Sequence, residues 1–385
     1  MMGFRKKKDK LKTGWQARVI RNNEPKKENI KNDQVIANKR RSNIFEKIFK
    51  WIIYGILFLA IPRYLKSSKV KGKEIVDDAY QKINSNEFAF IPAGYAMYLF
   101  LSFIPIACLF VAIIGPISEH YDIVLRYVIL GRIIPGVQTT LPNMATIWKG
   151  AGGIIAFILF AVSIIWLASK GYAKFAYSID ALYEHKTPRR MWMYRLKGVV
   201  ISIILTFGLT LMLLGFTAFM TFLIESSEFG VFPSEITSDF TIKNLELKTE
   251  FWLIYYFTII LLLPFFTYIG FLIFFKWAPS FKLKLNHAHP GAMISAIPTS
   301  IFILIFGSLA SIIPYNKYGP IASFMYIILL MSVMSYFIYT GLIVNASFHK
   351  IFINQPTIAK TWFFKNKTKN SFYKKYNTEN YSSED

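Results

Sequence analysis

The pattern of apolar and charged positions divides the chain into long uncharged stretches. No Asp, Glu, Lys, Arg or His occurs within residues 90–115, 150–169, 198–224, 251–275, 290–316 and 318–348. Each stretch reaches the roughly 20 residues that a helix needs to cross the hydrocarbon core, and none keeps a polar face for water. The pattern therefore predicts an all-α integral membrane protein with six transmembrane helices, at about 90–115, 150–169, 198–224, 251–275, 290–313 and 321–347. Only Lys317 separates the last two stretches, which predicts a tight helical hairpin at 314–320.

A weaker apolar segment precedes these spans. Residues 44–65 begin with charged positions, and their uncharged part, 51–61, is too short to cross the bilayer. We expect an interfacial helix here, with a spanning or re-entrant helix as the alternative. Residues 1–43 are strongly basic and lack periodicity, which predicts a disordered cytoplasmic tail. The six-helix membrane domain is expected over 74–350, and a second cytoplasmic tail over 351–385.

The loops between the spans indicate one orientation. Lys and Arg are concentrated in 170–197 and 276–289, whereas 116–149 is mixed and 225–250 is acidic. Because basic loops stay on the cytoplasmic side, both termini are predicted to be cytoplasmic. The basic start of the chain is not followed by the apolar region of a signal peptide, so we expect it to be retained. The abundance of Lys, Ile, Phe and Asn is typical of an AT-rich bacterial genome.

Composition agrees with a membrane location. The 385 residues are 54% hydrophobic and 17% charged, and the mean hydropathy is +0.37. The formal net charge of +23 fits either nucleic acid or an anionic membrane surface. No RNA-binding fold or aromatic stacking platform accompanies the basic tails, so we expect no specific nucleic acid partner. The expected partners are the lipid bilayer and anionic lipid headgroups, and a membrane or cytoplasmic protein if the tails recruit one.

The sequence lacks the signatures of catalysis and of cofactor binding. It contains no Walker A loop, no Gly-rich dinucleotide turn, no nucleophile elbow and no HExxH. Cys108 is the only cysteine, which excludes an intrachain disulfide and a thiolate cluster. His287 and His289 lack a third metal ligand nearby, so a solvated loop is the favoured interpretation. We expect no cofactor, no metal and no enzymatic activity.

Small and kinking residues within the spans are the first candidates for a substrate path. Pro105 removes a backbone hydrogen bond from the first span and is expected to kink it. Gly291, Ser295 and Thr299 recur every four residues on one face of the fifth span. This spacing is typical of helices that approach each other closely, and a substrate-lining face is the alternative.

Charged positions at the predicted cytoplasmic ends of the spans are the second group of candidates. Lys170 and Lys174 share one face of the second helix, with Asp180 near its end, and Lys282 and Lys284 lie in a basic loop. Lysines that snorkel to the interface account for the pattern on the second helix. The alternative is a cationic mouth for an anionic headgroup.

Five short motifs occur in order along 74–350. They are Gly94-Tyr95-Ala96-Met97-Tyr98-Leu99-Phe100-Leu101-Ser102-Phe103-Ile104-Pro105, Trp166-Leu167-Ala168-Ser169-Lys170-Gly171 through Ala181-Leu182-Tyr183, Pro279 with Lys282 and Lys284, Pro290-Gly291-Ala292, and Tyr318-Gly319. Together they resemble the YihY/virulence factor BrkB family of bacterial inner-membrane proteins, formerly labelled ribonuclease BN, with Met97 where a Tyr is usual. The resemblance implies a six-helix, multi-pass protein of the bacterial plasma (inner) membrane, whose activity is unsettled.

One position departs from the family pattern. The last span of the family commonly ends in a Gly-Ala-Glu-like element, whereas here Gly341-Leu342-Ile343-Val344-Asn345 has Ile343 at the acidic position. Any role of that carboxylate in relatives therefore does not carry over. The former nuclease label fits poorly, because metal-dependent nucleases need clustered acidic residues and histidines, and the five histidines here are scattered over the predicted loops.

The sequence favours transport or handling of an anionic amphiphile or lipid. An amphiphile can keep its tails in lipid while its headgroup moves along hydroxyl groups, so uncharged spans suit it better than they suit a hydrophilic ion. The alternative is a non-catalytic membrane scaffold that recruits partners. The candidate path residues are Ser102, Pro105, Lys170, Lys174, Asp180, Lys282, Lys284, Gly291, Ser295, Thr299 and Asn345.

Overall fold

The structure of the protein is a computed structural model that describes residues 44–133, 151–185, 190–226, 229–232, 242–312 and 319–358. The chain divides into two compact units, residues 1–49 and 50–385. Of the first unit, only the residues that begin helix α2 (Ile44–Ala60) are described. The predicted N-terminal tail, most of the predicted C-terminal tail and most of the turn expected at 314–320 lie outside the described residues.

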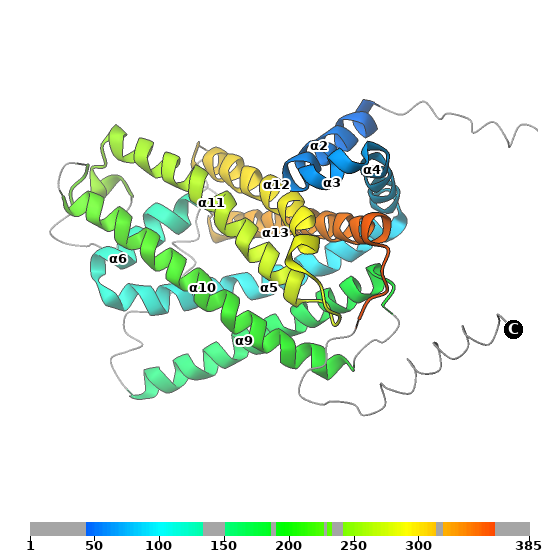
Figure 1. The fold of residues 1–385 in the computed structure, drawn as a ribbon. Coiled ribbons are helices and arrows are strands. Elements are labelled where there is room, and N and C mark those ends of the chain that lie inside the picture. The colour runs from blue at the N-terminus through cyan, green and yellow to red at the C-terminus, as the bar shows by residue number, and fades with distance from the viewer. Residues whose placement is uncertain are drawn as a thin grey trace, which may run out of the picture. The chain divides into compact units, whose positions relative to one another are not determined.

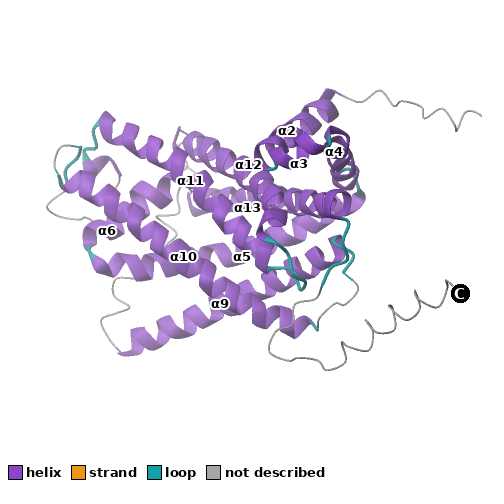
Figure 2. Ribbon diagram, in the orientation of Figure 1, coloured by secondary structure: helices purple, strands orange, loops and turns teal. Residues whose placement is uncertain are grey.

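Six helices that are long and apolar enough to cross a membrane dominate the second unit (Figures 1 and 2). They are α5 (Asn86–Ile114), α9 (Ala151–Leu182), α10 (Met191–Glu225), α11 (Thr249–Trp277), α12 (Leu285–Ile312) and α13 (Gly319–Phe348). The protein is therefore an all-α integral membrane protein with six transmembrane helices, as the uncharged stretches predicted. Helix α9 runs past the end of the predicted span at 169, as the placement of Asp180 near its end required, and Tyr172, Ala176 and Ile179 keep a buried face at helical spacing.

Helix α13 is the most deeply buried of the spans. It contacts α12, α5 and α4, while α9 pairs with α10 and α11 pairs with α12. Within the most apolar stretch of each helix, the buried share is 61% in the last span, against 6% in α11, 11% in α9 and 17% in α10. Helices α9, α10 and α11 therefore leave most of their apolar surface to lipid.

Three shorter helices precede the first span. Helix α3 (Pro62–Ser67) begins at Pro62, whose fixed φ and missing N–H suit the first turn of a helix. Ser68 then caps α4 (Lys69–Ile83), because its Oγ accepts a hydrogen bond from the Lys71 N–H at 3.3 Å. Helix α4 packs against α13 and was not predicted from the sequence. The membrane-interface location expected for 44–65 stays a prediction.

The loop expected between the first two spans contains a buried helical segment. A turn (Gly115–Ile117) leads into α6 (Glu119–Ile123), a π-helical turn (Val124–Leu130) and α7 (Gly131–Ile133). The segment is packed into the bundle through side chains that are almost wholly inaccessible, namely Ile123, Val124, Leu125, Val128 and Ile129. Helix α7 lies against α12 at Gly307, where an added Cβ would meet the Arg132 carbonyl oxygen at 2.7 Å. The charged residues of this stretch made it resemble a polar loop, so these helices were not predicted. In the structure the buried Arg126 is paired with Asp122 at 2.7 Å, which allows the segment to pack.

Candidate functional site

Most of the charged candidate residues lie at one end of the bundle, which we call the basic end. It is formed by the C-terminal ends of α9 and α13, the N-terminal ends of α10 and α12, the loop 278–284 and helix α4 (Figure 1). Aromatic contacts join these elements, for example between the rings of Tyr183, just after α9, and His349, just after α13, whose centroids are 5.3 Å apart.

Asp180 fastens three of these elements together. Its side chain is 3% exposed and accepts a hydrogen bond from the Tyr194 hydroxyl of α10 at 2.5 Å and another from the Ser280 N–H at 2.9 Å. A buried carboxylate needs such donors to offset the loss of water. Close by, the buried Lys197 donates to the carbonyl oxygens of Ala278 at 3.2 Å and Pro279 at 2.7 Å. The position of Asp180 is therefore that of an anchor for the loop 278–284, with its oxygens already engaged.

Gly291, Ser295 and Asn345 lie where α12 crosses α13. The Asn345 Oδ1 accepts from the Gly291 N–H at 2.6 Å, its Nδ2 donates to the Ala288 carbonyl at 3.1 Å, and the Ser295 Oγ donates to the Phe337 carbonyl at 3.1 Å. A Cβ added at Gly291 would clash with the backbone oxygen of Gly341. The two backbones therefore approach as closely as only glycine allows.

The other candidate residues are more dispersed. Lys170 is half-buried on α9, and the exposed Lys174 places its ammonium 4.6 Å from the Tyr98 ring centroid. Lys282 and Lys284 are exposed in the loop before α12. Thr299 is fully buried in α12. Ser102 and Pro105 lie within α5, but their side chains fall outside the description.

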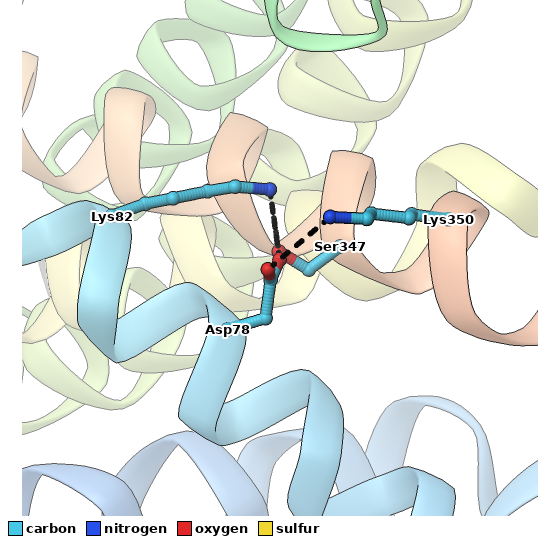
Figure 3. Close-up of polar contacts among 4 residues, drawn as sticks. All are labelled: Asp78, Lys82, Ser347 and Lys350. Carbon is cyan, nitrogen blue, oxygen red and sulfur yellow. Dashed lines mark hydrogen bonds and ion pairs between the residues drawn. The ribbon is translucent and has the colours of Figure 1, made fainter. Parts of the chain in front are cut away.

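A polar cluster that the sequence did not predict joins α4 to the end of α13 (Figure 3). The Asp78 carboxylate accepts from the Lys82 ammonium at 2.8 Å and from the Ser347 hydroxyl at 2.6 Å, and the Lys350 ammonium lies 3.8 Å away. Lys82 also reaches the Ser347 Oγ at 3.4 Å. Burial alone would raise the pKa of Asp78, but the hydrogen bonds from Lys82 and Ser347 and the two lysine charges outweigh it, so the pKa lies below its ordinary value of 3.8.

A cavity of about 550 Å³ opens beside this cluster. Its walls come from Lys82 of α4, from the end of α9 and the residues after it (182–185), and from Ala346 of α13 with His349 and Lys350 just after that helix. The last wall is a segment that we call the strap, residues 354–357. Asn354 reverses the chain in a left-handed conformation (φ 43°). The strap is then fixed by a 2.6 Å contact between Thr357 Oγ1 and His185 Nδ1, and by the Lys282 N–H, which donates to the Ile358 carbonyl at 2.7 Å.

The lining of the cavity limits its chemistry. Two lysines and two histidines lie beside amide and hydroxyl groups, which suits reversible binding of an anion. Among the described residues, no group of three or more His, Cys, Asp or Glu side chains is placed to hold a metal ion. The one sequence signal for this cluster was the spacing of Asp78 and Lys82, four residues apart on a helix. Its other members come from the far end of the chain.

Comparison with known proteins agrees with this architecture. The family model for virulence factor BrkB matches residues 79–361, which include all six spans, the Lys82 and Lys350 walls of the cavity, and the strap. No curated protein and no solved structure gives a significant match. Because the family model covers well over half of the sequence, the chain belongs to the virulence factor BrkB family.

Proposed function

We propose that this protein handles an anionic amphiphile, such as a phospholipid, and moves it within the bilayer without a catalysed reaction. The observation that carries the proposal is the incomplete covering of two neighbouring spans. No residue of α11 between 262 and 274 is buried, although residues nearer both ends of the helix are. In α10, Thr210 is the only buried residue between 202 and 215.

A helix with one packed face buries about one residue in every three or four. The middles of α10 and α11 therefore leave part of their inner faces uncovered. In a bilayer, lipid acyl chains cover such a surface, because they are the apolar groups that surround the helices. A substrate with two hydrocarbon chains can enter there from the side, whereas a hydrophilic ion gains nothing from it.

Hydroxyl groups next to this stretch offer a headgroup uncharged polar contacts. The Thr267 and Ser300 hydroxyls, on α11 and α12, are 2.7 Å apart. The buried Thr299 Oγ1 has no hydrogen-bond partner among the described residues. An uncharged path of this kind costs less in the hydrocarbon core than a charged one.

The basic end faces the cytoplasm in this proposal, because Lys and Arg are concentrated there. In this proposal Lys170 and Lys174 form a cationic mouth on α9, the helix that packs against α10. Lys174 is exposed, so its ammonium remains open to a phosphate even while it lies over Tyr98.

The test is lipid redistribution in reconstituted vesicles. We expect the wild type to change the transbilayer distribution of a labelled anionic phospholipid, and the Lys170→Gln/Lys174→Gln variant to do so more slowly. A Lys69→Gln/Lys73→Gln variant, which removes the same charge from exposed positions of α4, should match the wild type. Equal redistribution by the wild type and by empty vesicles would refute transport and favour a membrane scaffold that recruits partners.

A further inference from the structure

We propose that the cavity at the basic end is a binding site for a phosphate group, held between Lys82 and Lys350. This inference rests on the proposed function, because it names the place where the headgroup of the amphiphile is bound. It concerns residues outside the mouth formed by Lys170 and Lys174.

The charges around the cavity favour an anionic ligand. Lys82 on α4 and Lys350 after α13 both line the cavity, and both are drawn to the single carboxylate of Asp78, at 2.8 and 3.8 Å (Figure 3). One carboxylate thus balances only one of two ammonium groups. Among the described residues that line the cavity, the only acidic one is Glu184. Its side chain is exposed to solvent, where its charge is screened.

The positions of the two lysines favour a phosphate group as that ligand. The two lysines come from helices far apart in the sequence and converge on one point, as in sites that clamp a phosphate between several donors. His185 and His349 add ring nitrogens to the same walls. The Lys350 side chain is 63% exposed and that of Lys82 is 32% exposed, so both ammonium groups can be reached by a ligand.

The volume decides which kind of phosphate fits. At about 550 Å³ the cavity lies within the range of roughly 300–1,000 Å³ typical of sites for small organic ligands. Inorganic phosphate would fill only a small part of it. A phosphate ester with a polar glycerol-sized group would fill more, and Asn354, Gln355 and Thr357 of the strap supply amide and hydroxyl partners for that group.

The Asp78 carboxylate provides the most specific test of the phosphate site. Its carboxylate occupies the position between the two ammonium groups that a phosphate oxygen would take. Bound phosphate and Asp78 therefore compete for the same donors. Removal of the negative charge in Asp78→Asn should strengthen phosphate binding, whereas loss of the lysines should weaken it.

The experiment measures binding by calorimetry with the full chain in non-ionic detergent. The probes are dihexanoyl phosphatidylglycerol and inorganic phosphate. We expect the short-chain lipid to bind the Lys82→Gln/Lys350→Gln variant at least about ten-fold more weakly than the wild type, the change that one lost charge-assisted hydrogen bond produces. Asp78→Asn should bind more tightly, and the matched pair Lys69→Gln/Lys73→Gln should bind as the wild type does.

Two results would overturn the site: wild-type affinity in Lys82→Gln/Lys350→Gln, or an equal loss in the Lys69→Gln/Lys73→Gln pair. Lys350→Gln alone, at an exposed position, covers the case in which the double variant does not fold, and the gain in Asp78→Asn cannot arise from misfolding. Equal affinity for inorganic phosphate would identify the free anion as the ligand of the same site. If the wild type binds the probe through Lys82 and Lys350 but redistributes no lipid, the proposed function fails and the site stands.

Discussion

The close approach of α12 and α13 at Gly291 and Gly341 leads to a stringent test of the fold. A methyl group at Gly291 would be driven into the Gly341 carbonyl oxygen and would lie 2.5 Å from Asn345 Nδ2. Neither backbone can yield without moving a whole helix, so α12 and α13 must separate. We therefore expect Gly291→Ala to destabilise the protein, although alanine is the better helix former.

The magnitude follows from two contributions. Overpacking of a close interface costs about 1–3 kcal/mol. Separation of the helices also lengthens the hydrogen bond from the Gly291 N–H to Asn345, now 2.6 Å, at a further cost of about 0.5–1.5 kcal/mol. The expected loss is about 1.5–4.5 kcal/mol in the free energy of unfolding. The assay is unfolding of the purified full chain in mixed micelles, followed by tryptophan fluorescence.

Gly270 in α11 provides the matched control. A Cβ added there meets nothing within 4 Å, so Gly270→Ala should leave stability unchanged or raise it by up to about 1 kcal/mol. If Gly291→Ala is as stable as Gly270→Ala, the two backbones do not meet at Gly291, and the packing described for α12 and α13 is incorrect.

Three further outcomes are expected. Tyr194→Phe removes a hydrogen bond to the buried Asp180 and should lower the unfolding free energy by about 1.5–3 kcal/mol, measured in the same micelles; an unchanged value would contradict the anchoring role. Because the folded-state pKa of Asp78 is lowered, its contribution to stability should be complete above about pH 3.8 and be lost as the pH falls through the folded-state pKa; an Asp78→Asn variant with the same acid dependence would refute this. In a cysteine-free background, a single cysteine at Ser118 should react with an impermeant thiol reagent in intact cells and one at Thr187 should not, and the reverse result would invert the orientation.

The spans could be predicted from the sequence because lipid imposes one simple rule, the exclusion of charge over about 20 residues. The spacing of Gly291 and Ser295 likewise predicted close approach of helices, and α13 does come close there. That rule says nothing about amphipathic helices outside the spans. Helix α4 carries charges along most of its length, and its identity as a packed element depends on α13.

The candidate site was less accessible to sequence reasoning. Asp180 was correctly placed near the end of α9, but its engagement by Tyr194 and Ser280 depends on how three elements meet in space. The buried helices around Arg126 were hidden because the ion pair with Asp122 makes a packed segment resemble a polar loop. In both cases the charged residue could be read from the sequence, but the residue that it contacts in the folded protein could not.

The contact between Asp78 and Ser347 spans 269 residues of sequence, which has a consequence for biosynthesis. At roughly 5–20 residues per second, the ribosome needs on the order of 10–50 s after Asp78 to reach its partner. Throughout this interval α4 lacks the helix against which it packs in the complete protein. Docking of α4 therefore requires that α13 has been synthesised, and a chain that ends before α13 leaves the buried face of α4 without its partner.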